Sequence, residues 1–179
     1  YSEHLFAQAV QILPVYALTG NIILAYNLLF LSTFVLSGLG MFLFVREMTG
    51  SARAGLVAGL MYGLAPYRVP QFSHLQVISS QWIPFVLYGL RRYFVTRRIT
   101  PLAGAGAALI AQNLSNGHFL LFFAPFVLAY AIFEIATRRL WADARVWLAL
   151  SATAVIVTAV TLPFLLPYLE LRRLGFGPR

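Results

Sequence analysis

The feature that most constrains this chain is a run of 25 residues, 21–45, that contains no charged side chain (NIILAYNLLFLSTFVLSGLGMFLFV). Runs of about 20 predominantly apolar residues are typical of membrane-spanning helices. Further apolar stretches occupy residues 75–94, 118–136 and 146–169, and each of them adjoins arginines. The pattern predicts an all-α fold, a polytopic transmembrane helical bundle.

Composition supports this class. The chain is 60% hydrophobic, with a mean hydropathy of +0.80 and only 10% charged residues, whereas about a quarter of the residues of a soluble domain are charged. We expect one transmembrane domain over residues 1–179, with about six membrane-embedded helices within 21–169. Residues 1–20 are too polar for a confident span and fit the end of an outer loop with an interfacial helix. Residues 170–179 would begin the next outer loop.

Two segments depart from simple spans. Residues 53–66 are apolar but short, and Gly55, Gly59 and Gly63 recur every fourth position, which predicts a close helix-packing face. A helix here would stop short of the far surface. Residues 75–94 would form a span that Pro84 kinks.

The thirteen basic residues are all arginine, and their positions indicate topology. Nine of them fall in the loops 46–53, 91–98 and 138–145, and only four lie elsewhere. The positive-inside rule places these three loops in the cytoplasm. This pattern argues against a nucleic-acid partner despite the net charge of +8. The chain has no cysteine, which excludes disulfides and thiol chemistry.

The opposite, outer face would then gather most of the remaining polar residues. The stretch 67–84 (YRVPQFSHLQVISSQWIP) is the most polar part of this face, and polar groups near membrane depth indicate a functional site. The predicted outer-face residues are Glu3, His4, Tyr67, Arg68, Gln71, His74, Gln76, Asn113, Asn116, His118, Glu170 and Arg172.

Within this set, Arg68 and His74 could hold a phosphate, since arginine offers a bidentate fork and a protonated histidine a second charge. Arg68 could equally contact lipid headgroups. Gln76 and Gln81 could line a polar groove or only make interhelical hydrogen bonds. His74 and Gln81 are seven residues apart, so they would share one face of a helix.

Glu3 and His4 could supply a carboxylate and an imidazole for proton transfer, or they could form a solvated interfacial turn. His118 could contact a ligand, although a position at the end of a helix is slightly favoured. The three histidines show no metal-ligand spacing, so we expect no metal site among them. Asn113-Leu114-Ser115 also matches a glycosylation sequon.

Three stretches carry a family resemblance: YSEHL at 1–5, AYNLLFLSTFVLSGLGMFLFVREMTGS at 25–51, and GLAPYRVPQFSHLQVISSQWIPF at 63–85. The chain resembles, over nearly all its length, bacterial polytopic membrane proteins related to GT-C glycosyltransferases. The resemblance implies an enzyme of the bacterial inner membrane that takes a sugar from a polyprenyl-phosphate donor at the outer face. Residue 1 would lie on that same outer side.

In that superfamily an acidic motif in the first outer loop serves as a base or as a ligand for a divalent metal ion. Residues 1–20 look like the end of that loop, so the motif would lie upstream, and we expect this chain to be part of a longer protein. Glu3 is the only acidic residue left there, and with His4 it is the candidate for catalysis. Arg68, His74, Gln76, Gln81 and His118 are the candidates for substrate binding.

The alternative is a non-enzymatic polytopic protein such as a transporter or flippase. Transporters are typically built from repeats with broken helices in both halves. Residues 53–66 fit a broken helix, but no convincing internal repeat is visible in the sequence.

Overall fold

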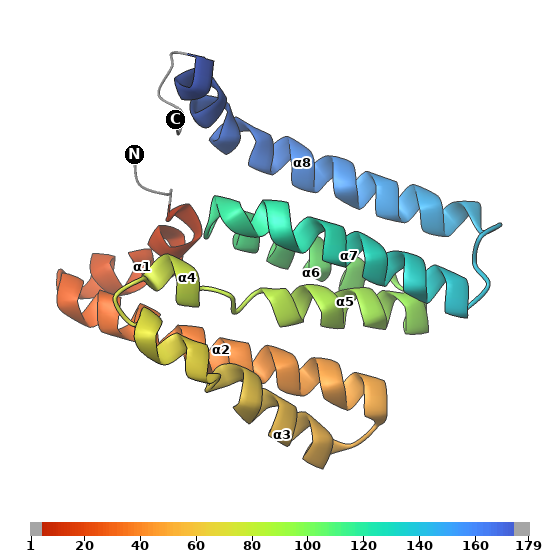
Figure 1. The fold of residues 1–179 in the computed structure, drawn as a ribbon, viewed down its shortest axis with the longest axis horizontal. Coiled ribbons are helices and arrows are strands. Elements are labelled where there is room, and N and C mark those ends of the chain that lie inside the picture. Colours follow the sequence, from red (N-terminus) through yellow and green to blue (C-terminus); the bar gives the residue numbers. More distant parts are fainter. Residues whose placement is uncertain (1–4, 174–179) are drawn as a thin grey trace.

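The computed structural model describes residues 5–173 and is helical over most of that range (Figure 1). The elements in chain order are α1 (Phe6–Thr19), α2 (Ile22–Thr49), α3 (Ala52–Gly63), the 3-10 helix η1 (Pro66–Gln71), α4 (Leu75–Ile78), α5 (Ile83–Thr96), α6 (Ile99–Asn113), α7 (Gly117–Thr137) and α8 (Ala144–Arg173). The described residues contain no β-strand, which confirms the all-α fold.

The long helices lie side by side as a bundle (Figure 1). α2 packs against α3 and α5, α5 packs against α6, and α6 packs against α8. α7 covers α5 and α6, while α1 packs against α2. The turns that follow α2, α5 and α7 gather at one end, which we call the arginine-rich end. The segments that follow α1, α3 and α6 gather at the other, arginine-poor end.

The turns at the two ends of α2 use the same residue types. Gly20 and Gly50 end α1 and α2 with φ angles of 62° and 71°, a left-handed conformation that glycine adopts without steric penalty. The side chains of Asn21 and Ser51 then accept backbone N–H groups in the first turns of α2 and α3. Short polar caps of this kind fix where an apolar helix begins.

The glycine face predicted for α3 is confirmed. Gly55, Gly59 and Gly63 are all buried, and a Cβ atom on Gly59 would lie 2.7 Å from the carbonyl oxygen of Gly38 in α2. Only glycine therefore permits this backbone approach. α3 ends at Gly63, which lies against Phe34 and Gly38 near the middle of α2, so α3 does stop partway along its neighbour.

The prediction of one continuous helix over residues 75–94 was wrong. α4 ends at Ile78, and α5 begins only at Ile83. Pro84 lies in the first turn of α5, where its missing N–H group has no intrahelical acceptor to lose. His74 and Gln81 therefore share no helical face: His74 is exposed, whereas Gln81 is fully buried.

The structure supports fewer clear membrane spans than expected. By length and composition, two helical segments among the described residues can cross a bilayer, Ile22–Thr49 and Ala144–Phe164. α3, α5 and α6 have 12, 14 and 15 residues, so each is roughly 18–23 Å long. The hydrocarbon core is about 30 Å thick. The expected bundle of about six spans is thus not established, because these helices are short.

The arginine-rich end is held together by ion pairs that the sequence did not predict. Glu134 in α7 is 1% exposed. Its carboxylate accepts hydrogen bonds from Arg91 at 2.9 Å and from Arg138 at 2.7 Å, and a third from the Tyr130 hydroxyl. A buried carboxylate with several charge-assisted partners ties α5 to α7.

Two further pairs complete this end. Arg92 in α5 bonds to Glu47 in α2 at 3.1 Å, and Arg97 bonds to Asp143 in the turn before α8. The prediction that most of the other polar residues gather at the opposite face was therefore incomplete. The three acidic residues whose side chains the structure describes all lie here, and each is paired with arginine.

Candidate functional site: a buried polar layer

Polar side chains are buried together toward the arginine-poor end, and we call this set the polar layer. Each member is at most 5% exposed. The members are Gln8, Ser37, Arg68, Ser79, Ser80, Gln81, Gln112, Asn113, Ser115 and Asn116. They come from α1, α2, η1, the break between α4 and α5, and the junction of α6 with α7.

The break between α4 and α5 explains part of this layer. Where a helix stops, its last carbonyl groups lose their intrahelical donors and need other partners. Arg68 donates to the carbonyl oxygen of Ile78 at 3.1 Å, and Gln112 donates to that of Ser79 at 2.9 Å. Side chains from η1 and α6 thus satisfy a backbone break that lies inside the protein.

Arg68 is the only charged member of the layer. Its guanidinium donates to the hydroxyl of Ser37 at 2.7 Å and to that of Ser80 at 3.0 Å. It also lies 5.2–5.9 Å from the ring centroids of Phe34, Tyr62 and Tyr67. No ion pair among the described residues includes Arg68. Hydroxyls, a carbonyl and aromatic faces therefore compensate this cation.

This geometry bears on the predicted phosphate site of Arg68 and His74. Arg68 is 0% exposed, whereas His74 is exposed just before α4, with its Nδ1 atom 3.1 Å from the hydroxyl of Ser73. The two side chains thus have different surroundings. Joint phosphate binding stays a prediction, and it requires a rearrangement that makes Arg68 accessible.

Two amides of the layer tie together elements that are far apart in sequence. Gln8 in α1 donates to the carbonyl oxygen of Ser115 at 3.0 Å, and Asn116 donates to that of Gln76 in α4 at 3.3 Å. The helix predicted to lie at the interface is therefore joined to the start of α7. Gln76 takes part here through its backbone; a substrate contact by its side chain stays a prediction.

Several buried amide atoms of the layer have no protein partner. Both polar atoms of Gln81 and both of Asn113 are unpaired, as are the carbonyl oxygens of the Gln8 and Gln112 side chains. An unsatisfied buried polar group costs roughly 1–3 kcal/mol, so native proteins keep few of them. An amide offers both a donor and an acceptor. The layer is therefore suited to a bound group that also does both, such as a hydroxyl.

The other predicted site residues lie apart from these amides or cannot be placed. Glu3 and His4 are outside the described residues. His118 is exposed at the start of α7, where its backbone N–H donates to the Asn116 side chain at 2.8 Å. That position fits the helix-end interpretation. Among the side chains that the structure describes, no three His, Asp or Glu residues gather to hold a metal ion.

Sequence reasoning missed Gln8, Gln112 and Ser37 and gave Asn113 too small a role. Asn113 is 3% exposed, so its sequon is inaccessible in the folded chain. The available signal was the placement of amide residues at the ends of apolar helices, as in IAQN before the turn at 114–116.

Comparison with protein-family models, curated proteins and solved structures finds no match for this chain. Its function is therefore inferred from the site itself.

Proposed function

We propose that this chain is an integral membrane protein with several bilayer-embedded helices and with its polar layer toward the non-cytoplasmic side. Large apolar side chains are exposed along the bundle, among them Ile23, Val35, Met61 and Leu148. Soluble monomers rarely expose extensive apolar surface. Nine arginines lie in the turns or adjoining helix ends of the arginine-rich end, as expected for the cytoplasmic side.

The activity we propose is transfer of a sugar from a polyprenyl-phosphate donor, catalysed at the arginine-poor end. The observation that supports it best is the set of buried, unpaired amides in the polar layer. Sugar hydroxyls donate and accept hydrogen bonds; the unpaired Gln81 amide can do both, and the unpaired side-chain oxygen of Gln112 can accept. The resemblance to GT-C glycosyltransferases favours the same class of reaction.

In this reaction the bond between the anomeric carbon and the phosphate oxygen breaks, and the polyprenyl phosphate leaves with the bonding electrons. The acceptor oxygen forms the new bond to that carbon and gives its proton to a base. Glu3 and His4 are our candidates for that proton transfer. Arg68 and His74 are candidates for the phosphate, and Gln76 and His118 for further substrate contacts.

The test of the activity uses Gln81→Met in native membranes. Losing a hydrogen bond to the sugar should lower donor turnover by about tenfold. Arg139→Ala, at the arginine-rich end, is the control and should leave turnover unchanged. Donor consumption is measured per amount of inserted protein. Equal turnover in Gln81→Met and the parent would remove the layer from the reaction.

One observation favours a transporter as a second candidate. The segment between α3 and α5 is broken twice, and its residues 78–81 are buried, a pattern that the discontinuous helices of transporters also show. Proteoliposomes would separate the two candidates. A transporter moves solute in the absence of any acceptor and leaves the sugar–phosphate bond intact.

Membrane embedding has its own test. Reporter fusions at Arg97 and Arg139 should give a cytoplasmic signal, and fusions at Gln71 and Asn116 a non-cytoplasmic one. Reversed signals at Arg97 and Gln71 would contradict the proposed orientation. A protein released from membranes by alkaline carbonate would contradict embedding itself.

A further inference from the structure

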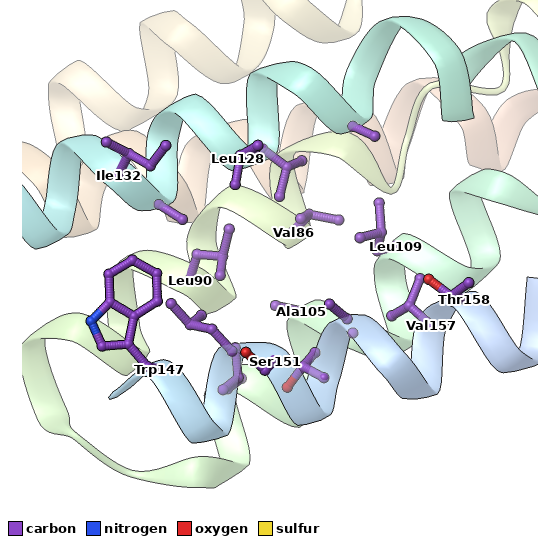
Figure 2. Close-up of a pocket in the computed structure, with 18 of the residues that line it drawn as sticks. Val86, Leu90, Ala105, Leu109, Leu128, Ile132, Trp147, Ser151, Val157 and Thr158 are labelled. Atoms are coloured by element: carbon purple, nitrogen blue, oxygen red, sulfur yellow. The ribbon is translucent and has the colours of Figure 1, made fainter. Parts of the chain in front are cut away.

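A groove of about 360 Å³ runs between α7 and α8, above a floor of α5 and α6 (Figure 2). We call it the α7–α8 groove. Leu128 and Ile132 line it from α7, and Val157 lines it from α8. Val86 and Leu109 lie on the floor between them. The volume is within the range of ligand pockets, roughly 300–1,000 Å³.

The walls of the groove favour an apolar chain. None of the described residues that line it is charged. The lining Thr153 hydroxyl is already bonded within its helix, to the carbonyl of Ala149. Along α6 the groove extends from Leu102 to Asn113, which is roughly 16 Å of helix. A long, uncharged site of this kind suits an extended alkyl chain.

One end of the groove carries a specific polar group. Asn113, the last residue of α6, lines the groove and is 3% exposed, and both polar atoms of its amide lack a protein partner. The arginines and carboxylates of the arginine-rich end are not part of the lining. An amide without nearby charge favours a neutral head that both donates and accepts a hydrogen bond, and it offers nothing to neutralise a phosphate.

The sides of the groove connect it to the surroundings of the bundle. α7 and α8 each pack against α6, and residues on their outer faces, such as Phe133 and Leu148, are exposed and apolar. In a bilayer these faces would meet lipid chains. A lipid could therefore enter the groove sideways, between the two helices, without passing through water.

We propose that the α7–α8 groove binds one alkyl chain of a lipid whose uncharged, hydroxyl-bearing head bonds to Asn113. This inference rests on membrane embedding but not on the proposed transferase activity. Monoacylglycerol has the required chemistry, with a single chain and a neutral head with hydroxyl groups. An anionic phospholipid lacks it.

Trp147 lines the groove and provides a direct probe. In a Trp82→Phe/Trp141→Phe background it is the one remaining tryptophan of three. The purified protein is placed in phosphatidylcholine vesicles, and a monoacylglycerol brominated along its chain is titrated in as a quencher. We expect saturable quenching, half-complete at a mole fraction about five- to tenfold lower than in the same background with Asn113→Leu.

Two variants serve as controls. Asn27→Leu makes the same chemical change at an exposed position of α2 and should leave the titration unchanged. Ala154→Phe fills the groove from an exposed position that lines it, and it should abolish the preference over brominated phosphatidylcholine. Melting temperatures of all variants in detergent identify any that fail to fold.

Three results would overturn the proposal. Equal titrations for the parent and Asn113→Leu would mean that Trp147 senses only the bulk bilayer. Equal or stronger quenching by brominated phosphatidylglycerol would mean that the head need not be neutral. Quenching that falls as protein density rises would mean that a second copy of the chain occupies the groove.

Discussion

The two ends of the bundle differ in whether their buried polar side chains have hydrogen-bond partners. At the arginine-rich end Glu134 is buried, and two guanidinium groups and a hydroxyl satisfy its carboxylate. At the arginine-poor end Gln81 and Asn113 are equally buried, but neither amide has a partner. The buried carboxylate at the first end is therefore fully compensated, whereas the buried amides at the second end retain capacity for hydrogen bonds.

This difference indicates which substitutions should affect stability and which should affect function. Removing a partner from a satisfied buried charge leaves the remaining charges uncompensated, which destabilises strongly. Removing an unsatisfied amide eliminates a desolvation penalty and can even stabilise. Substitutions in the ion pairs of the arginine-rich end should therefore mainly lower stability. Substitutions of the unpaired amides at the arginine-poor end should mainly lower activity.

The largest loss of stability is expected at the close contact between α3 and α2. In Gly59→Leu the new side chain would meet the Gly38 carbonyl, because even a Cβ atom would lie 2.7 Å from it. Two backbones cannot relax as a side chain can, so we expect a loss on the order of 3 kcal/mol. Unfolding in sodium dodecyl sulfate measures it. Gly104→Leu, where a Cβ meets nothing within 4 Å, should be mild; equal losses would refute the contact face.

Arg68 is a member of the polar layer whose guanidinium has three bonded partners, and its substitution tests the comparison from that side. Arg68→Ala removes packing against three rings and bonds to Ser37 and Ser80. A large-to-small change in a core costs at least about 2 kcal/mol, and we expect a loss of roughly 2–3 kcal/mol here. His74→Ala, at an exposed site, should leave the melting temperature unchanged. A stable Arg68→Ala protein would show that this arginine is not a structural clamp.

Glu134→Gln tests the arginine-rich end. It leaves Arg91 and Arg138 without a carboxylate, and bonds to a charged partner contribute roughly 1.5–3 kcal/mol. We expect a loss of about 2 kcal/mol, measured by thermal melting in detergent. Glu47→Gln is the matched control, because its partner Arg92 is 42% exposed and such pairs contribute less than about 1 kcal/mol. Similar losses would mean that burial does not distinguish the pairs.

The smallest effect on stability is expected for Gln81→Met. Both amide atoms are unpaired, so the change should leave the melting temperature unchanged or raise it slightly. Gln112→Met, which removes a bond to the Ser79 carbonyl, should instead lose about 1 kcal/mol. A strongly destabilised Gln81→Met protein would show that the Gln81 amide is satisfied, and the contrast between the two ends would then fail.

Much of the helical fold could be predicted because it depends on local sequence. The recurrence of Gly55, Gly59 and Gly63 predicted a packing face, and α3 buries it against α2. An interfacial helix was expected within residues 1–20, and α1 (Phe6–Thr19) forms there. The break before α5 was not predicted, because a proline in an apolar run fits either a kink or a new helix. What distinguishes the two is that the carbonyls of residues 78 and 79 accept hydrogen bonds from side chains of η1 and α6.

The sequence by itself determined an apolar all-α chain with its arginines concentrated in alternate turns, since composition and periodicity act over a few residues. Which polar residues meet was decided by the tertiary structure alone. Gln8 and Ser115 are 107 positions apart, and Arg91 and Glu134 are 43 apart. The same structure paired Glu134 and left Asn113 unpaired. The physical reason is that hydrogen bonds and ion pairs depend on distances between helices, and helix packing fixes those distances.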